Sequence, residues 1–296
     1  MREDEFIVHR SVMVEEVLEF LRPKPGGTYV DCTVGGGGHS LEILRRTGGK
    51  CRIIGIDRDP EIIKKARARL REFEGSVVLV NERFSNLDRV LNDAGIHRVD
   101  GFVFDLGISS FQIDVAERGF SFLKDGPLDM RMDRSGELTA YEIVNEYDEE
   151  ELARILKDYG EEPLARKIAR EIVKLRPVKT TVELARIVSR VYRSVYGNRS
   201  HKHPATKTFQ ALRIAVNDEI EELKKALKKT LNYLRLGGRI VVISFHSIED
   251  RIVKNFFRDN TGVLKILTKK PLYPTGEEIK SNPRARSARM RVAEKC

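Results

Sequence analysis

Short runs of apolar residues recur in the first and last thirds of the chain, and most of them end at an acidic or small polar residue. The runs cover residues 29–31, 53–57, 77–80, 99–105 and 239–244. Each is rich in β-branched or aromatic residues and shorter than an average helix, so each predicts a strand. The pattern therefore predicts an α/β protein built on a mostly parallel sheet.

Apolar residues at helical spacing occupy the segments between these runs. They predict helices over residues 60–72, 208–236 and 248–259. The Gly237-Gly238 pair is the expected end of the second of these helices. Residues 264–273 and 288–293 predict a closing antiparallel pair, which brings the sheet to about seven strands.

The alternation of strands and helices stops in the middle of the chain. Residues 115–134 are irregular, with Gly119 and the Gly126-Pro127 pair among them. Helical segments follow near residues 139–147, 149–175 and 181–196, the second with a break at 160–163. We therefore expect an all-helical domain inserted into the sheet domain. The predicted boundaries are 1–112 and 206–296 for the sheet domain, and 113–205 for the insertion.

Four consecutive glycines, 35–38, separate the first predicted strand from the helix after it. Without a Cβ, this turn lets backbone amides close around a ligand. Asp57 ends the second strand, 26 residues after Asp31, where a βαβ unit presents a carboxylate to ribose hydroxyls. The spacing is neither GxGxxG nor a phosphate-binding loop. The stretch predicts a site for a nucleoside cofactor, and a merely flexible turn is the alternative.

Polar residues also follow the later strands. Asp105 ends the fourth strand, and His246 and Ser247 follow the fifth. Strand ends beside the switch point of an open parallel sheet line its active site, so chemistry is expected here. Asp105 as a helix cap is the structural alternative. Phe84, after the third strand, is suited equally to contact with an adenine ring and to core packing.

The charge distribution indicates a polyanionic partner. The net charge is +9, and residues 264–296 alone hold nine Lys or Arg against three Glu. Residues 192–207 combine basic and aromatic side chains on an irregular segment, which suits RNA; a solvated loop is the alternative. The candidate RNA contacts are Arg193, Arg199, Lys202, Lys207, Arg284, Arg286 and Arg289.

Other classes of protein are disfavoured. No apolar segment approaches the ~20 residues of a membrane span, and the first residues do not form a signal peptide, so a cytoplasmic protein without membrane contact is expected. The three cysteines have no metal-binding or disulfide spacing. His201 and His203 lack an accompanying acid or cysteine, so no metal is predicted.

Longer motifs resemble one family. The segments HRSVM, VDCTVGGGGHS, GIDRD, DLGISSFQID, GPLDMRMD, HPATKTFQALRIAVNDEI, GGRIVVISFHSIEDRIVK and NPRARSARMR, in this order, are similar to those of the ribosomal RNA small-subunit methyltransferase H family. The resemblance covers nearly the whole chain. It implies the fold of a class I S-adenosylmethionine-dependent methyltransferase, Rossmann-like, with an inserted helical domain that helps to bind RNA.

The resemblance also implies a reaction and a set of site residues. The family methylates the N4 amine of a cytidine in the decoding region of small-subunit rRNA. The positions that match its cofactor contacts are Gly37, Gly38, His39, Asp57, Phe84, Asp105 and Gln112. The partner is then small-subunit rRNA or the assembled small subunit, and the sequence leaves a homodimer open.

The chemistry needs an acceptor near the amine, because the lone pair of cytosine N4 is delocalised into the ring. Asp105 is the first candidate, and His246 and Ser247 are candidates for holding the base. The Pro-Pro-Tyr motif of other amino methyltransferases is missing, and Asp105-Leu106-Gly107-Ile108 takes its place.

Three alternative functions stay open on the residues alone. A dehydrogenase shares the βαβ start, but the basic insertion and tail do not call for a nicotinamide. A non-catalytic assembly factor that binds RNA would have no need of an intact glycine loop. A methyltransferase acting on DNA or protein would share the fold.

Overall fold

The computed structural model describes residues 11–197 and 203–296. Its internal contacts divide the chain into two compact units. We call residues 1–107 with 221–296 the sheet unit, and residues 108–220 the helical unit. The helical unit is longer than the insertion predicted at 113–205, because it begins earlier and includes α10 (Thr206–Asn217).

The sheet unit is built on one seven-stranded sheet, in the order β3-β2-β1-β4-β5-β7-β6. β7 pairs antiparallel with both β5 and β6, and the other strand pairs are parallel. The mostly parallel sheet predicted from the apolar runs is confirmed. The strands are β1 (Thr28–Asp31), β2 (Arg52–Asp57), β3 (Val77–Asn81), β4 (Val99–Asp105), β5 (Leu234–Ser244), β6 (Leu264–Ile266) and β7 (Arg289–Lys295).

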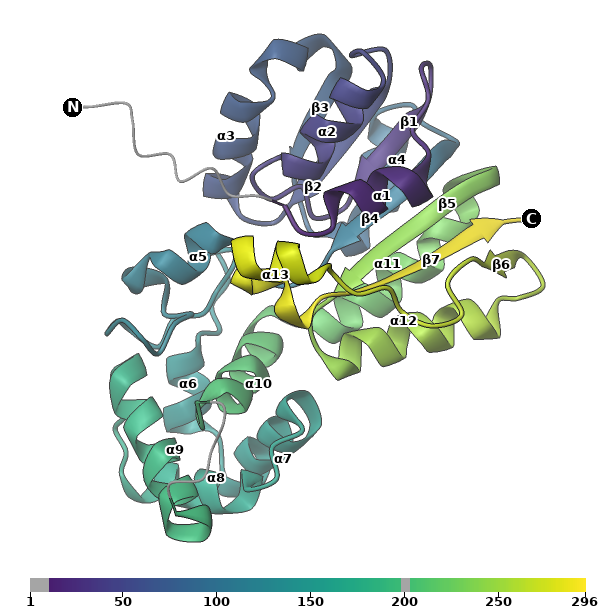
Figure 1. The fold of residues 1–296 in the computed structure, drawn as a ribbon. Coiled ribbons are helices and arrows are strands. Elements are labelled where there is room, and N and C mark those ends of the chain that lie inside the picture. The colour runs from purple at the N-terminus through teal and green to yellow at the C-terminus, as the bar shows by residue number, and fades with distance from the viewer. Residues whose placement is uncertain (1–10, 198–202) are drawn as a thin grey trace. The chain divides into compact units, whose positions relative to one another are not determined.

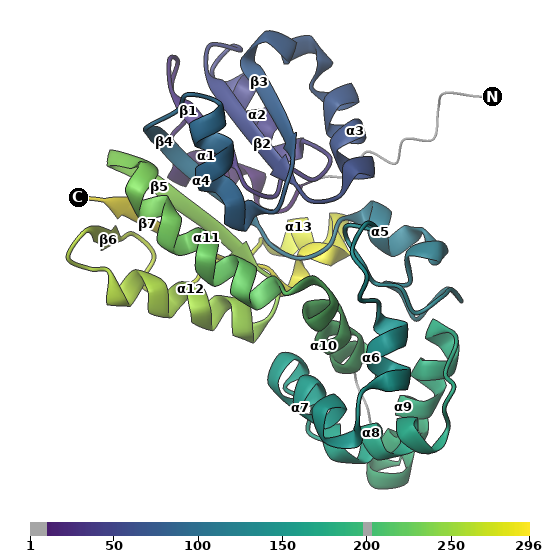
Figure 2. The ribbon, with the colours of Figure 1, turned by 180° about the vertical axis from the view of Figure 1, so that it is seen from behind.

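Both faces of the sheet are covered by helices, as continuous apolar strands require. Alternate residues face opposite sides: Val30 packs with α4, α11 and α12, and Tyr29 packs with α1 and α2. Figure 1 shows α1 and α2 over one face, and Figure 2 shows α4 and α11 over the other. The helices are α1 (Val14–Leu21), α2 (Gly38–Arg46), α3 (Pro60–Arg69), α4 (Leu87–Asp93), α11 (Glu219–Tyr233), α12 (Ser247–Asp259) and α13 (Gly276–Ser281).

The strand order reverses direction between β1 and β4, which are parallel neighbours. From β1 the chain moves outward through β2 to β3, and then returns to β4 on the other side. In open α/β sheets ligands bind at such a reversal, beyond the carboxyl ends of the two strands, and we call this place the crevice. Asp31 and Asp105, the last residues of these two strands, mark this point.

The helical unit forms a core of its own, in which Ile143, Leu156, Ile168, Leu184 and Leu212 are buried. Its helices are α5 (Ser110–Asp114), α6 (Ala140–Glu146), α7 (Glu149–Gly160), α8 (Ala165–Lys174), α9 (Thr181–Tyr196) and α10. The helical segments predicted after residue 139 are confirmed, and the break predicted at 160–163 separates α7 from α8. None of the helices in the described residues is long and apolar enough to cross a membrane.

Three predictions near the second half of the sheet were wrong in detail. The single helix expected over 208–236 is interrupted at Asp218, which adopts a left-handed conformation (φ 52°) between α10 and α11. Gly237-Gly238 does not cap α11, which ends at Tyr233; the pair lies within β5. The strand expected over 264–273 is only β6, followed by an isolated bridge at Leu272.

Candidate active site

The glycine turn fits closely against neighbouring elements. Gly37 has a φ of 80° and precedes α2, and its N–H donates to the Val34 carbonyl at 2.7 Å. Gly38 begins α2, and a Cβ there would lie 1.9 Å from the Ser11 hydroxyl oxygen. A side chain at Gly37 would require a strained backbone, and one at Gly38 would displace the Ser11 hydroxyl. The backbone is held in one conformation at the crevice between β1 and β4.

Asp57 ends β2 beside this turn. Its carboxylate accepts the Gly35 N–H at 3.1 Å and the Asp59 N–H at 2.9 Å. Burial raises the pKa of Asp57 to about 7. The carboxylate therefore braces the glycine turn itself, which is a role that spacing alone did not indicate.

Asp31 and Asp105 occupy the crevice. Asp31 is buried and accepts the Ser40 hydroxyl proton at 2.7 Å. The Asp105 N–H donates to the Thr33 hydroxyl at 2.6 Å, so the loop after β1 holds the end of β4. Burial raises the pKa of Asp105 to about 6, and Oδ1 of this side chain has no hydrogen-bond partner among the described residues. A buried acceptor without a partner fits a ligand that donates or carries positive charge.

His39 lies next to Asp105 on the first turn of α2. Its ring is buried, with Nε2 2.9 Å from the Val12 carbonyl oxygen. Because a carbonyl can only accept, the proton is on Nε2. The other nitrogen, Nδ1, lies 3.7 Å from Asp105 Oδ2, too far for a hydrogen bond.

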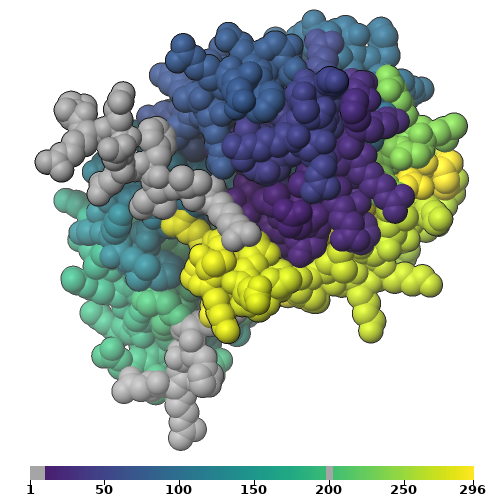
Figure 3. All heavy atoms as spheres, turned by 45° about the horizontal axis from the view of Figure 1, so that its top comes forward, coloured from purple at the N-terminus to yellow at the C-terminus, as the bar shows by residue number. Residues whose placement is uncertain are grey.

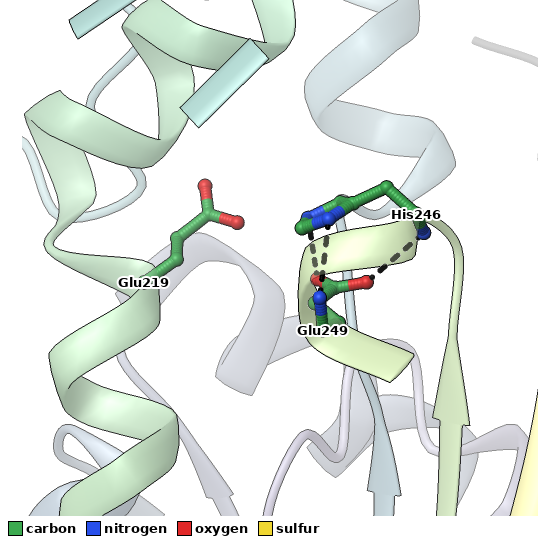
Figure 4. Close-up of side chains that lie close together, drawn as sticks. All are labelled: Glu219, His246 and Glu249. Atoms are coloured by element: carbon green, nitrogen blue, oxygen red, sulfur yellow. Dashed lines mark hydrogen bonds and ion pairs between the residues drawn. The ribbon is translucent and has the colours of Figure 1, made fainter. Parts of the chain in front are cut away.

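His246 and Ser247 stand at the start of α12, immediately after β5. His246 is the N-cap: its Nδ1 accepts the Glu249 N–H at 3.4 Å, and Glu249 accepts the His246 N–H at 3.3 Å. Figure 4 shows the imidazole over the Glu249 carboxylate, with Nε2 3.1 Å from Oε1. These two atoms are close enough for an ion pair but do not form a hydrogen bond. His246 Nε2 has no hydrogen-bond partner among the described residues. The structure thus gives His246 a capping role in addition to the predicted one.

The remaining cofactor candidates have local packing roles. Phe84 begins the 3-10 helix η2 (Phe84–Asn86). Its half-buried ring packs edge-on against Phe104, with the ring centroids 6.0 Å apart. Gln112 belongs to the helical unit, where its side chain accepts the Ser109 N–H at 3.0 Å in the capping box of α5. Gly37, Gly38, His39, Asp57 and Asp105 are brought together at the carboxyl edge of β1, β2 and β4.

The candidate RNA contacts are distributed over both units. Arg193 is exposed in the last turn of α9, and Lys207 is exposed on α10, where its Nζ donates to the Glu161 carbonyl at 2.8 Å. Arg284 and Arg286 are exposed on the 3-10 helix η4 (Pro283–Ser287), and Arg289 is half-buried in β7. Arg199 and Lys202 lie outside the described residues. His203 stacks on Phe122 at 4.2 Å, with its Nδ1 accepting the Ala205 N–H.

Three site residues were missing from the sequence-based set. Asp31 and Ser40 form a buried hydrogen-bonded pair. Asp31 could have been found from the sequence, because it is the acid that ends β1. Glu249 caps α12 with His246, and its signal was the three-residue spacing of a capping box. Neither signal alone distinguishes a site residue from a helix cap.

The sheet order, the glycine turn after β1 and the acids ending β1, β2 and β4 define a class I S-adenosylmethionine-dependent methyltransferase fold. Comparison with known proteins gives the family. The chain belongs to the MraW methylase family, whose model matches residues 6–296.

Several curated relatives match over nearly their whole length. A protein of Kosmotoga olearia is 51% identical over 289 residues, which cover 97% of each chain. One of Thermotoga neapolitana is 50% identical over 97% of this chain and 95% of its own. A protein of Clostridium botulinum, strain Kyoto, is 47% identical over 97% of this chain and 98% of its own. All three are named ribosomal RNA small subunit methyltransferase H.

Proposed function

We propose that this protein transfers a methyl group from S-adenosylmethionine to the N4 amine of one cytidine in the decoding region of small-subunit ribosomal RNA. The main support for the proposal is Oδ1 of Asp105, which lies at the switch point of the sheet and has no hydrogen-bond partner among the described residues. The chain also belongs to the MraW methylase family. The names of the relatives support the substrate class. The resemblance of the motifs supports the nucleoside. We propose a cytoplasmic site of action.

The residues of the crevice fit the cofactor. The turn at Gly37 and Gly38 leaves no room for side chains, so its backbone keeps the tight conformation between strand and helix that a nucleoside cofactor would require. Asp57 would face the ribose, and Asp105 would accept from the cationic methionine end or from the amine. The cofactor supplies an activated methyl group when bound; the protein supplies position and electrostatics. Acids in the crevice suit a ligand that carries positive charge.

The acceptor amine requires an oriented base. A cytosine N4 becomes positive as it attacks, so a nearby carboxylate stabilises the developing charge. Asp105 is the first choice for this role. His246 and Ser247 are positioned at the end of β5, where the capping box fixes the imidazole. We propose that they hold the base, and that the exposed arginines Arg193, Arg284 and Arg286 contact the phosphate backbone.

The decisive experiment follows labelled methyl from S-adenosylmethionine into small ribosomal subunits purified from cells that lack the enzyme. Nucleoside analysis of the rRNA should recover the label as N4-methylcytidine. Label in a different nucleoside would refute the assigned acceptor. Absence of label, with cofactor binding intact, would refute the rRNA substrate.

A second arm compares protein-free rRNA with the assembled subunit. We expect label in the assembled subunit, because folded rRNA presents one nucleotide in a fixed shape. The Gly37→Asp variant serves as the negative control. Its side chain would meet Leu70 and would require a left-handed backbone, so cofactor binding should be lost. Retained RNA function in this variant would instead favour a non-catalytic binding factor.

A further inference from the structure

Met13 has an unusual backbone conformation that one distant side chain holds in place. It lies in the left-handed region, with φ 53° and ψ 40°, immediately before α1. Its N–H donates to Oε1 of Glu278 at 2.7 Å. Glu278 belongs to α13, 265 positions further along the chain. Figure 3 shows this C-terminal segment, in yellow, against the purple N-terminal one.

The same turn holds the imidazole of the active site. The Val12 carbonyl, directly before the Met13 N–H, accepts from His39 Nε2 at 2.9 Å. One peptide unit thus connects the α13 carboxylate to the buried ring. A non-glycine residue with positive φ costs about 1 kcal/mol or more and persists only where its surroundings fix it. The Glu278 contact is such a fixing interaction.

Glu278 also belongs to the charged surroundings of Asp105. Burial is the main cause that raises the pKa of Asp105; His39 opposes it, and Asp31, Glu249 and Glu278 add to it. These groups come from β1, α2, α12 and α13. The carboxylate of α13 therefore acts on the site both through the Met13 turn and through its charge.

We propose that Glu278 is a positioning residue of the active site. By accepting the Met13 N–H, it fixes the preceding carbonyl, and this carbonyl holds His39 as the Nε2–H tautomer. Nδ1 is then the ring nitrogen that lies 3.7 Å from Asp105 Oδ2. The inference rests on the proposed function for its catalytic consequence, but the contact itself can be tested in the protein without any ligand.

The direct test is the tautomer of His39, measured by two-bond ¹H–¹⁵N NMR of uniformly labelled protein. The His39 signal is assigned from its absence in His39→Gln. The neutral imidazole of the wild-type protein should be the Nε2–H tautomer. Glu278→Ala should show a mixture of tautomers, because the Val12 carbonyl is released. An unchanged Nε2–H tautomer in a folded Glu278→Ala protein would overturn the proposal.

Glu278→Gln separates the hydrogen bond from the charge. The amide oxygen still accepts the Met13 N–H, so the tautomer should be retained. Loss of the negative charge should lower the pH midpoint for cofactor binding, because one of the groups that raise the pKa of Asp105 is gone. A midpoint equal to that of wild type would contradict the electrostatic part. Glu277→Gln is the matched control on the same helix turn, and it should change neither readout.

The affinity for S-adenosylmethionine, measured by calorimetry at neutral pH, links the contact to function. Glu278→Ala should weaken binding about tenfold, since a partly buried hydrogen bond to a charged group is lost. Glu278→Gln should bind as wild type does at high pH. Equal affinity in Glu278→Ala and Glu277→Gln would refute the positioning role. No binding by the wild-type protein would refute the proposed function instead.

Discussion

The two units use buried charge in different ways. In the helical unit, Arg118 is fully buried and donates to the carbonyls of Arg131 and Met132, while Glu162 accepts from the Tyr192 hydroxyl and the Leu164 N–H. In the sheet unit, Asp105 has one oxygen without a partner among the described residues, as Glu162 does, but Asp105 lies at the switch point of the sheet and burial raises its pKa. Charges that secure the backbone belong to folding, whereas a charge kept available beside a crevice belongs to ligand binding. We therefore expect the buried charges of the helical unit to stabilise its fold, and Asp105 of the sheet unit to take part in the chemistry.

The largest expected effect is on catalysis, and it comes from the sheet unit. Asp105→Asn should reduce methyl transfer about 100- to 1000-fold, because the amide cannot stabilise developing positive charge. The free energy of unfolding should not fall, since a buried carboxylate is replaced by a neutral group of the same shape. Single-turnover transfer and urea denaturation measure the two quantities. If Asp105→Asn loses enough stability to explain its lost activity, then Asp105 serves folding as the buried charges of the helical unit do, and the proposed difference between the units is wrong.

The reverse result is expected in the helical unit. Arg118→Ala should lower the free energy of unfolding by about 3 kcal/mol, because two carbonyls lose their donor and a cavity is left. Cofactor affinity should stay within about twofold of wild type, because the crevice belongs to the other unit. Urea denaturation and calorimetry test the pair of outcomes. A large loss of cofactor affinity would show that the units are not independent.

The pH dependence distinguishes the units again. Asp105 and Asp57 have pKa values near 6 and 7, above the ordinary value of 3.8, so the folded protein holds their protons more tightly than the unfolded chain does. Their contribution to stability is therefore largest below pH ~4 and is lost as the pH rises towards 7. Asp105→Asn should flatten the decline between pH 4 and 6, whereas Arg118→Ala should leave it unchanged. Denaturation at a series of pH values provides the measurement.

Cofactor affinity should have the opposite slope. A cationic ligand favours the ionised carboxylate, so affinity should rise as the pH increases through about 6, the pKa of Asp105. In Asp105→Asn this rise should be absent over the same interval. Titration calorimetry in buffers from pH 5 to 8 gives the answer, and a persistent rise would assign the titration to another group.

The smallest expected effects concern the RNA surface, to which both units contribute. Arg193→Ala in the helical unit, and Arg284→Ala with Arg286→Ala in the sheet unit, should each weaken RNA binding a few-fold. Each lost phosphate contact should reduce the slope of log affinity against log salt by about 0.7. Lys167→Ala, an exposed lysine of α8 outside the proposed surface, is the control. Loss from one unit alone would assign RNA binding to that unit.

Local sequence determined most of the architecture. The runs of apolar residues are strands, buried except in the edge strand β3, where Val78 is exposed. The side-chain period of two assigns Val30 and Tyr29 to opposite layers. The glycine turn, Asp57 and Asp105 were found because strand ends of a parallel sheet converge at one edge. The segments after residue 139 were recognisable as helices by their period and caps. These features depend on neighbours within a few residues.

Tertiary structure alone decided the finer relations. No local pattern connects Met13 to Glu278, because their hydrogen bond joins opposite ends of the chain. The left-handed break at Asp218 replaced a helix that the periodicity predicted as continuous. The unpartnered Oδ1 of Asp105 is visible only once every neighbour has a position. Sequence thus determined which elements form and which acids reach the crevice, whereas packing decided how those acids are protonated and held, because burial and long-range contacts set their electrostatics.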